Sequence, residues 1–133
     1  MKALTFEVVG KPVTQPRPRV LRTGRTYTPD NGIHAYRKAI AAAAIAAGAE
    51  PTDEAPLTLI IDLVFVRPKS HYKANGELNP KTALKVPPGD CSNYQKGIED
   101  CLNGIAYKDD VQIARTVVEK SYGQEARTTV RIQ

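Results

Sequence analysis

The sequence predicts an α/β (α+β) fold, with one mixed β-sheet and two main helices packed on it. Two observations lead to this prediction. Short runs of apolar and β-branched residues, typical of strands, occur at Leu4–Val9, Leu57–Val66, Val111–Lys120 and Ala126–Ile132. Two segments between them, Ile33–Ala47 and Asn93–Asn103, repeat apolar residues every three to four positions, as the buried side of a helix does. This order of elements implies one sheet with both helices against it.

The length and composition fit one globular domain. The chain has 133 residues, of which 41% are hydrophobic, and this suffices for a single core. No run approaches the roughly 20 apolar residues of a membrane span, and no secretory pattern opens the chain. Cys91 and Cys101 would lie about 15 Å apart along a helix, too far for a disulfide. We therefore expect one domain over residues 1–133, two free thiols and a cytoplasmic location.

Two of the expected strand regions carry further predictions. Leu57–Val66 is almost continuously apolar, which predicts a central strand buried on both faces. Asp62 interrupts it, either as an edge-facing or paired carboxylate or as a functional group. The last two strands, Val111–Lys120 and Ala126–Ile132, are separated by a short turn and predict an antiparallel hairpin.

The charges are unevenly distributed along the chain. There are 19 Lys and Arg against 14 Asp and Glu, for a net charge of +5. Lys11–Arg25 holds four arginines and three prolines, which predicts a loop or ragged hairpin with its guanidinium groups outward. Arg67–Pro88 is a long polar segment with four lysines, either a flap that grips a nucleic-acid backbone or an inert linker. A basic surface favours a polyanionic partner.

The candidate chemistry lies in Pro88–Ile113. Asp90 precedes the second helix, and Asp109 and Asp110 open the next strand. Within the helix, a polar stripe is formed at spacings of three, four and three by Asn93, Lys96, Asp100 and Asn103. Mg²⁺ prefers carboxylate and other oxygen ligands, and it can polarise a phosphodiester and activate water. A lysine beside it can stabilise the developing charge, so the pattern indicates a phosphodiesterase site.

Each of these residues also has a plain structural interpretation. Asp90 or Ser92 can be an N-cap, Lys96–Asp100 a surface ion pair, and Asp109–Asp110 a solvated turn. Spacing alone leaves both interpretations open. Aromatic residues are equally ambiguous, because Tyr72 and Tyr107 can either stack on an unpaired base or belong to the core or its rim. His34 and His71 have no partner pattern, and we expect ordinary surface or helix-face positions for them.

The run GDCSNYQKGIEDCLNGIAYKDDVQI resembles the signature of RusA-type Holliday-junction resolvases, which phages and prophages commonly carry. That signature is roughly D-x-D-N-x-x-K, followed by D-x-L-N-G and D-D-x-Q-[VI]. The opening Gly10-Lys11-Pro12 and Arg17-Pro18-Arg19 are also similar, as is Lys120 at the end of its strand. The resemblance spans most of the chain, and its specific motifs are concentrated in Gly89–Ile113.

The resemblance implies a homodimeric endonuclease that cuts four-way DNA junctions symmetrically with Mg²⁺ or Mn²⁺ in recombination and repair. It implies catalytic roles for Asp90, Lys96 and Asp110, with metal ligation by Asp90, Asp109 and Asp110. The supporting positions are Ser92, Asn93 and Asp100. We expect DNA contacts from the flap and from Lys11, Arg17, Arg19, Arg22, Arg25 and Lys120.

One position departs from the signature. Ser92 stands where the pattern has its second aspartate, and a serine supplies no negative charge to a cation. Either Asp109 or Asp100 completes the carboxylate count, or the site binds metal weakly. Three functions therefore stay open: a junction-resolving endonuclease, a nuclease for flaps, forks or single strands, and a non-catalytic protein that binds branched DNA.

Overall fold

A four-stranded mixed sheet organises the protein, whose computed structural model describes residues 2–133. The sheet contains β1 (Leu4–Val9), β4 (Leu57–Val66), β5 (Ile113–Gly123) and β6 (Arg127–Ile132) in the order β1-β6-β4-β5. β6 runs antiparallel to both β1 and β4, whereas β4 and β5 are parallel. The predicted single mixed sheet is confirmed.

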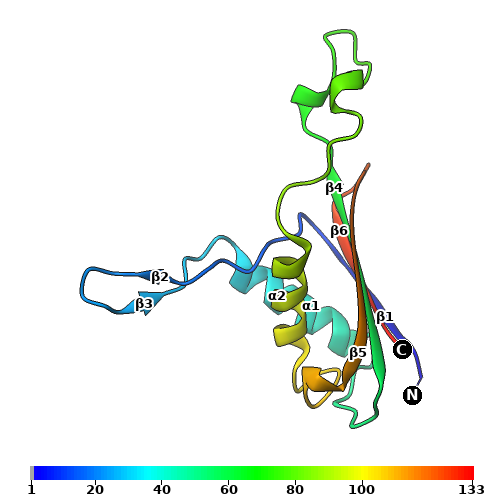
Figure 1. The fold of residues 1–133 in the computed structure, drawn as a ribbon. Helices are drawn as coiled ribbons and strands as arrows, with labels where there is room; N and C mark the ends of the chain where they lie inside the picture. The colour runs from blue at the N-terminus through cyan, green and yellow to red at the C-terminus, as the bar shows by residue number, and fades with distance from the viewer. Residues whose placement is uncertain (1) are drawn as a thin grey trace.

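Both main helices, α1 (Ile33–Ala46) and α2 (Cys91–Leu102), cover one face of this sheet (Figure 1). The core between them contains Ile40 of α1 and Leu102 of α2, both fully buried. Tyr36 and Thr128 connect α1 to β6 through a buried hydrogen bond of 2.5 Å between their hydroxyl groups. The α+β class is therefore confirmed, and so are the two predicted helices.

The central strand β4 is buried on one face only, contrary to prediction. Its odd-numbered residues, from Leu57 to Phe65, face the helices and are buried, whereas the alternate residues are partly or fully exposed. Asp62 lies on this second face and is exposed. The reason is that the other face of the sheet has no covering helix (Figure 1). Apolar residues such as Ile60 and Val64 fit there because a half-buried pleated surface favours β-branched side chains.

The predicted hairpin between the last two strands is wrong. β4 lies between β5 and β6 and pairs with both of them. The short link between β5 and β6 passes the end of β4, where Val66 is in register with Gly123 and Val64 with Arg127. By this insertion β4 pairs with β5 along its whole length, and its middle part, Leu59–Val64, also has a main-chain partner in β6. β5 also begins at Ile113 because Asp110–Gln112 form the 3₁₀ turn η3.

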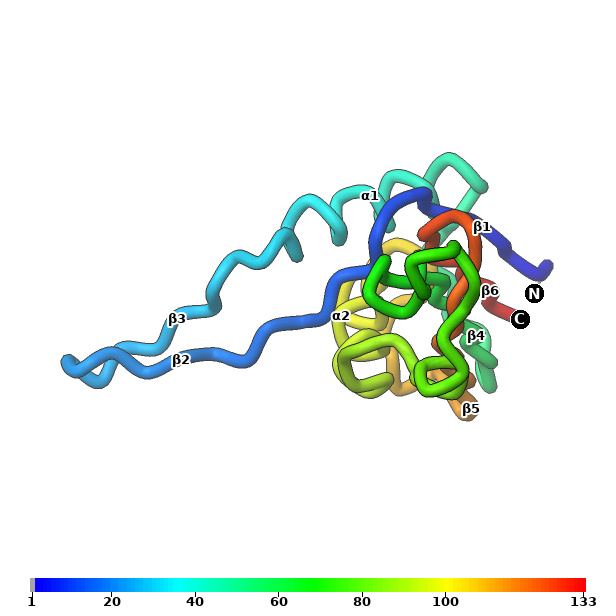
Figure 2. Tube along the Cα trace, turned by 90° about the horizontal axis from the view of Figure 1, so that it is seen from above, coloured from blue at the N-terminus to red at the C-terminus, as the bar shows by residue number. Residues whose placement is uncertain are grey.

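Two segments project from this core. The arm, residues 11–31, extends far from the sheet in both views (Figures 1 and 2) and carries the short pair β2 (Arg19–Val20) and β3 (Thr26–Tyr27). Of the two alternatives predicted for Lys11–Arg25, a loop or a ragged hairpin, the structure shows the hairpin. The flap, residues 67–87, continues beyond the end of β4 (Figure 1) and contains the 3₁₀ turns η1 (Lys69–His71) and η2 (Pro80–Thr82).

The flap has an internal anchor that the sequence did not predict. Arg67 donates to the Thr82 carbonyl at 2.9 Å, and its guanidinium lies 4.4 Å from the centre of the Tyr122 ring. His71 packs edge-on against Tyr122, with 5.7 Å between ring centroids. His71 is therefore buried rather than a surface residue. Burial lowers the pKa of His71, and the nearby charges of Arg67 and Lys85 lower it further.

Candidate active site

Asp90 is the N-cap residue of α2, which begins at Cys91, two residues earlier than predicted. Its backbone carbonyl accepts from the amides of Asn93 and Tyr94. Its carboxylate, by contrast, makes no capping hydrogen bond within the described chain. The plain structural interpretation, in which this side chain caps the helix, is therefore not what the structure shows. The carboxylate is exposed and is available to a ligand.

Gly89 fixes the approach to Asp90. Its φ of +93° is one that residues with a Cβ rarely adopt, and a Cβ here would lie 2.7 Å from the Tyr94 hydroxyl and 2.9 Å from Thr14 Cγ2. The chain at the base of the arm thus packs directly against the segment that leads into α2. Beside it is an open hollow of about 290 Å³ whose lining includes Lys11, Asn31 and Tyr94.

The predicted polar stripe runs along α2. Lys96 and Asp100 form an ion pair of 3.6 Å, with 72% of the lysine side chain and 36% of the aspartate side chain exposed. At this exposure the pair contributes only a few tenths of a kcal/mol to stability. Breaking this ion pair so that the Lys96 ammonium turns towards a phosphate therefore costs little free energy. Ser92 is exposed and Asn93 half-buried on the first turn of the same helix.

Asp110 belongs to η3 and lies beside the C-terminal end of α2. The Asn103 side chain, at the C-cap of α2, donates to the Asp110 carboxylate at 3.5 Å. The 12 residues of α2, at a rise of about 1.5 Å each, separate Asp110 from Asp90 by roughly 18 Å. The structure thus places two of the predicted catalytic aspartates at opposite ends of one helix.

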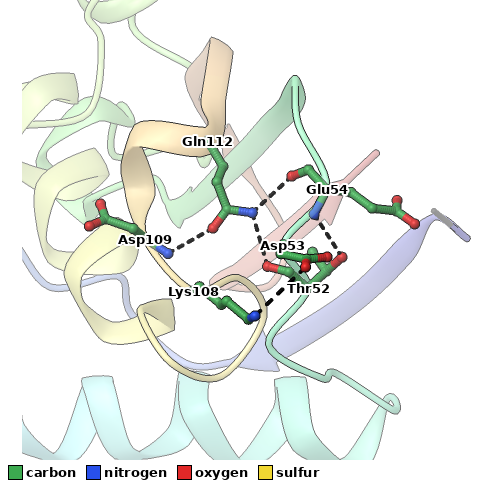
Figure 3. Close-up of polar contacts among 6 residues, drawn as sticks. All are labelled: Thr52, Asp53, Glu54, Lys108, Asp109 and Gln112. Carbon is green, nitrogen blue, oxygen red and sulfur yellow. Dashed lines mark hydrogen bonds and ion pairs between the residues drawn. The ribbon is translucent and has the colours of Figure 1, made fainter.

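Asp109 has a structural role that was not predicted from the sequence. Its carboxylate accepts from the Val111 amide at 3.0 Å. Its own amide donates to Gln112 Oε1 at 2.8 Å, as Figure 3 shows. Together these bonds form a capping box around η3. The signal was present in the sequence, because an aspartate followed three residues later by glutamine is the pattern of such a box.

Gln112 extends this arrangement to a neighbouring loop. Its amide donates to the carbonyls of Thr52 and Glu54 at 2.9 and 2.8 Å (Figure 3). Lys108 adds an exposed ion pair of 3.7 Å with Asp53. The Asp109 carboxylate points away from this loop (Figure 3). We conclude that Gln112 and Asp109 set the start of β5 and the position of Asp110.

Tyr107 lies beneath this end of the helix and cannot stack on a base. It is fully buried, and its hydroxyl donates to the Glu99 carbonyl at 2.8 Å. Burial raises the pKa of Tyr107 well above its usual value, and the carboxylates of Glu99, Asp110 and Asp100 raise it further. Of the two tyrosines considered for stacking, Tyr72 remains exposed, at 43%.

A divalent metal would need donors that one chain does not assemble. Carboxylates have the oxygen chemistry that Mg²⁺ prefers. Over residues 2–133, however, no three His, Cys, Asp or Glu side chains lie close enough to hold a metal ion. The donor types therefore fit a metal, but the spacing of Asp90 and Asp110 within a single chain does not.

The candidate DNA-contact residues fall into two groups. The four arginines of the arm, Arg17, Arg19, Arg22 and Arg25, are exposed, as is Lys11 at its base. Lys120 differs, because it lies half-buried on β5 and its ammonium donates to the carbonyls of Pro87 and Gly89 at 2.8 and 2.5 Å. It is thus engaged with the main chain that leads into Asp90.

Comparison with known proteins identifies the family. The sequence profile of the family described as Endodeoxyribonuclease RusA matches residues 9–133. The chain belongs to the RusA family. A relative from Bacillus subtilis (strain 168), the uncharacterized protein YqaN, is 33% identical over 138 residues, covering 100% of this chain and 97% of the relative. The resemblance inferred from the sequence is thereby confirmed, and the protein is an endodeoxyribonuclease of the RusA family.

Two further expectations concern the cysteines and membrane spans. Cys91 and Cys101 are both free and half-buried, so the predicted absence of a disulfide between them is confirmed. Within residues 2–133, no helix is long and apolar enough to cross a membrane.

Proposed function

We propose that this RusA-family protein is a Mg²⁺- or Mn²⁺-dependent endonuclease that resolves four-way DNA junctions by paired symmetric nicks, in recombination and repair. The observation that carries the proposal is the Asp90 carboxylate, which is exposed at the start of α2 and not used to cap it. Lys96 lies on the same helix with only a weak surface partner. Asp90 therefore offers a ligand oxygen, and Lys96 a positive charge for the scissile phosphate.

The metal site is proposed to form between two copies of the chain. When bound, the metal would polarise the phosphodiester and favour attack by water. Since Asp90 and Asp110 of one chain lie roughly 18 Å apart, they cannot ligate one ion together. An antiparallel approach of two α2 helices would set Asp90 of each chain beside Asp110 of the other. The homodimer that the family resemblance implies would thus create two equivalent sites, as two symmetric nicks require.

The remaining site residues have supporting roles in this proposal. Asn103 holds the Asp110 carboxylate. Asp109 caps η3, and we propose it as a further metal ligand. Ser92 and Asn93 present neutral oxygens on the first turn of α2, and Asp100 pairs with Lys96 on the same helix. Because Ser92 replaces a carboxylate, we expect a higher metal requirement than an aspartate at this position would give.

DNA would be held mainly through its phosphates. The arm carries Arg17, Arg19, Arg22 and Arg25, and the flap carries lysines 69, 73, 81 and 85. Both segments project from the core (Figure 1), so a dimer would present paired basic extensions to a branched substrate. Contacts of this kind recognise backbone and shape rather than sequence. A protein that acts on DNA in this way would be located in the cytoplasm, and we propose a phage or prophage origin for it.

A cleavage assay across DNA structures tests the proposal. We expect paired nicks in a labelled four-way junction with Mg²⁺, and much slower cutting of forks, flaps and linear duplex. Faster cutting of a fork or flap would assign another branched substrate to the same chemistry. Cleavage that persists in excess chelator would exclude the metal mechanism.

Ser92 supports one second candidate, a non-catalytic protein that binds branched DNA. In that case the natural chain binds junctions but leaves them uncut, and Ser92→Asp creates cleavage. Metal-dependent cutting by the natural chain would eliminate this candidate.

A further inference from the structure

The four residues before Asp90 are held almost entirely by side chains. Each successive carbonyl from Val86 to Gly89 accepts a hydrogen bond from a side chain. The donors are the Tyr122 hydroxyl to Val86 at 3.5 Å, the Lys120 ammonium to Pro87 at 2.8 Å, the Tyr94 hydroxyl to Pro88 at 3.0 Å, and Lys120 again to Gly89 at 2.5 Å. Pro87 and Pro88 in this segment have no amide hydrogen to donate to a neighbouring strand. Side-chain hydrogen bonds therefore hold the segment in position.

Lys120 provides two of these four bonds. It lies on β5 in register with the buried Leu63, so its side chain starts on the face of the sheet that the helices cover. From there its ammonium extends to the main chain of residues 86–89. The Gly89 carbonyl that it contacts belongs to the peptide bond between Gly89 and Asp90. Hydrogen bonds from a charged donor are stronger than those from a neutral one. Lys120 is therefore the strongest single constraint on this entry to α2.

The position of the Asp90 carboxylate depends on that constraint. Because the carboxylate makes no capping bond to its own helix within the described residues, its place is set by the backbone that precedes it. Gly89 shows how tight this backbone is, since its φ is +93° and a Cβ would meet Tyr94 at 2.7 Å. Small shifts of reacting groups have large effects on rate, so a loose segment would misplace Asp90.

We propose that Lys120 is a positioning residue that fixes Asp90 through the carbonyls of Pro87 and Gly89. This inference rests on the proposed function and assigns Lys120 a different role from the DNA contact expected from sequence. The two roles have different consequences. A DNA contact changes the affinity for the junction and the salt dependence of binding, whereas a positioning residue changes the rate of cleavage once the junction is bound.

The test compares Lys120→Met with Lys120→Arg and with the arm variant Arg19→Gln. Cleavage of a four-way junction is measured in a single turnover at saturating protein and Mg²⁺, and junction affinity is measured over a range of salt concentrations without Mg²⁺. We expect Lys120→Met to slow cleavage by roughly 10- to 100-fold with affinity and salt slope unchanged. Lys120→Arg should recover part of the rate. Arg19→Gln should weaken binding and flatten the salt slope.

A second readout needs no activity. Cys91 is adjacent to Asp90 and half-buried, so its modification by a thiol reagent reports how firmly the segment is held. In a Cys101→Ala background, Lys120→Met should speed modification of Cys91 several-fold, and Arg19→Gln should not. Circular dichroism verifies that each variant is folded, and Lys120→Gln replaces Lys120→Met if the latter is not.

The outcomes separate this inference from the proposed function. If the natural chain cuts no junction, the proposed function fails, and the Cys91 rates alone decide whether Lys120 holds the segment. An unchanged Cys91 rate in Lys120→Met would overturn the inference. So would weaker junction binding with a flatter salt slope and an unchanged saturated rate, because that result assigns Lys120 to the DNA.

Discussion

Two aspartates at N-cap positions use their carboxylates differently. Asp109 accepts from the Val111 amide and closes a capping box, whereas the Asp90 carboxylate makes no such bond to α2 in the described part of the chain. An N-cap bond is worth about 1 kcal/mol, and α2 forms without it. At the scale of single residues, this contrast separates a structural aspartate from one that is free for chemistry.

Substitutions at Asp109 test its structural role. Asp109→Ala should lower the free energy of unfolding by about 1 kcal/mol, or the melting temperature by roughly 4 °C. Asp109→Asn should keep most of this stability, because asparagine caps about as well as aspartate. Thermal unfolding measures both. If Asp109→Asn melts normally but cleaves poorly, Asp109 also serves as a metal ligand; equal melting of Asp109→Ala and the natural chain would refute the cap.

Ser92 permits a second substitution with a defined direction. Ser92→Asp adds a carboxylate one turn from Lys96, and we expect it to lower the Mg²⁺ concentration that gives half-maximal cleavage. The reason is that a hard cation gains more from a charged oxygen than from a hydroxyl. Titration of Mg²⁺ in the junction assay measures the effect, with the exposed Ser121→Asp as a charge-matched control. An identical Mg²⁺ requirement in both variants would remove Ser92 from the metal site.

At the scale of elements, the connection of α1 to β6 depends on a buried tyrosine. Burial raises the pKa of Tyr36 to about 12, against the opposing effect of its hydrogen bond to Thr128. The folded state therefore prefers the neutral phenol, since the usual pKa is about 10. The stability that follows from this is complete below pH 10 and is lost as the pH rises towards 12.

Denaturant unfolding between pH 9 and 12 checks this dependence. We expect the free energy of unfolding to fall above pH 10, and to fall less steeply in Tyr36→Phe, which has no phenol to ionise. The exposed Tyr27→Phe is the matched control and should follow the natural chain. A slope in Tyr36→Phe as steep as that of the natural chain would contradict the assignment.

Helices and strand pairings differ in how well they could be predicted from the sequence. The 3–4 spacing predicted both helices and the polar stripe of α2, because one helix determines that pattern locally. The partners of β4 could not be predicted, since the alternation in β5 and β6 is the same whether they pair with each other or on either side of β4. The separation of Asp90 from Asp110 was missed for a related reason. A motif close in sequence extends over roughly 18 Å once it spans a helix.

At the scale of the whole molecule, ten of the 19 lysines and arginines lie on the two projecting segments, five on the arm and five on the flap. The arm holds four exposed arginines, and the flap is fixed to β5 through Arg67 and Tyr122. Composition predicted a polyanionic partner. It could not predict that the two segments would be an extended arm and an anchored flap, because those shapes depend on contacts such as the one between Arg67 and Thr82.

Junction binding should accordingly depend steeply on salt. Each phosphate contact contributes about 0.9 to the slope of log affinity against log salt. Replacing the four arm arginines with glutamine should therefore reduce that slope by up to roughly 3 to 4. Four glutamines in place of Lys2, Arg115, Arg127 and Arg131 provide a control with equal charge outside the arm and flap. Equal losses of slope in both variants would mean that overall charge, rather than the arm, determines binding.

The central claim is that Asp90 takes part in metal-dependent cutting of four-way junctions. The most direct measurement is the single-turnover rate of junction nicking with Mg²⁺ by the natural chain and by Asp90→Asn, at protein concentrations that saturate binding. We expect paired nicks from the natural chain and none measurable from Asp90→Asn, with equal junction affinity. Undiminished nicking by a folded Asp90→Asn protein would contradict it.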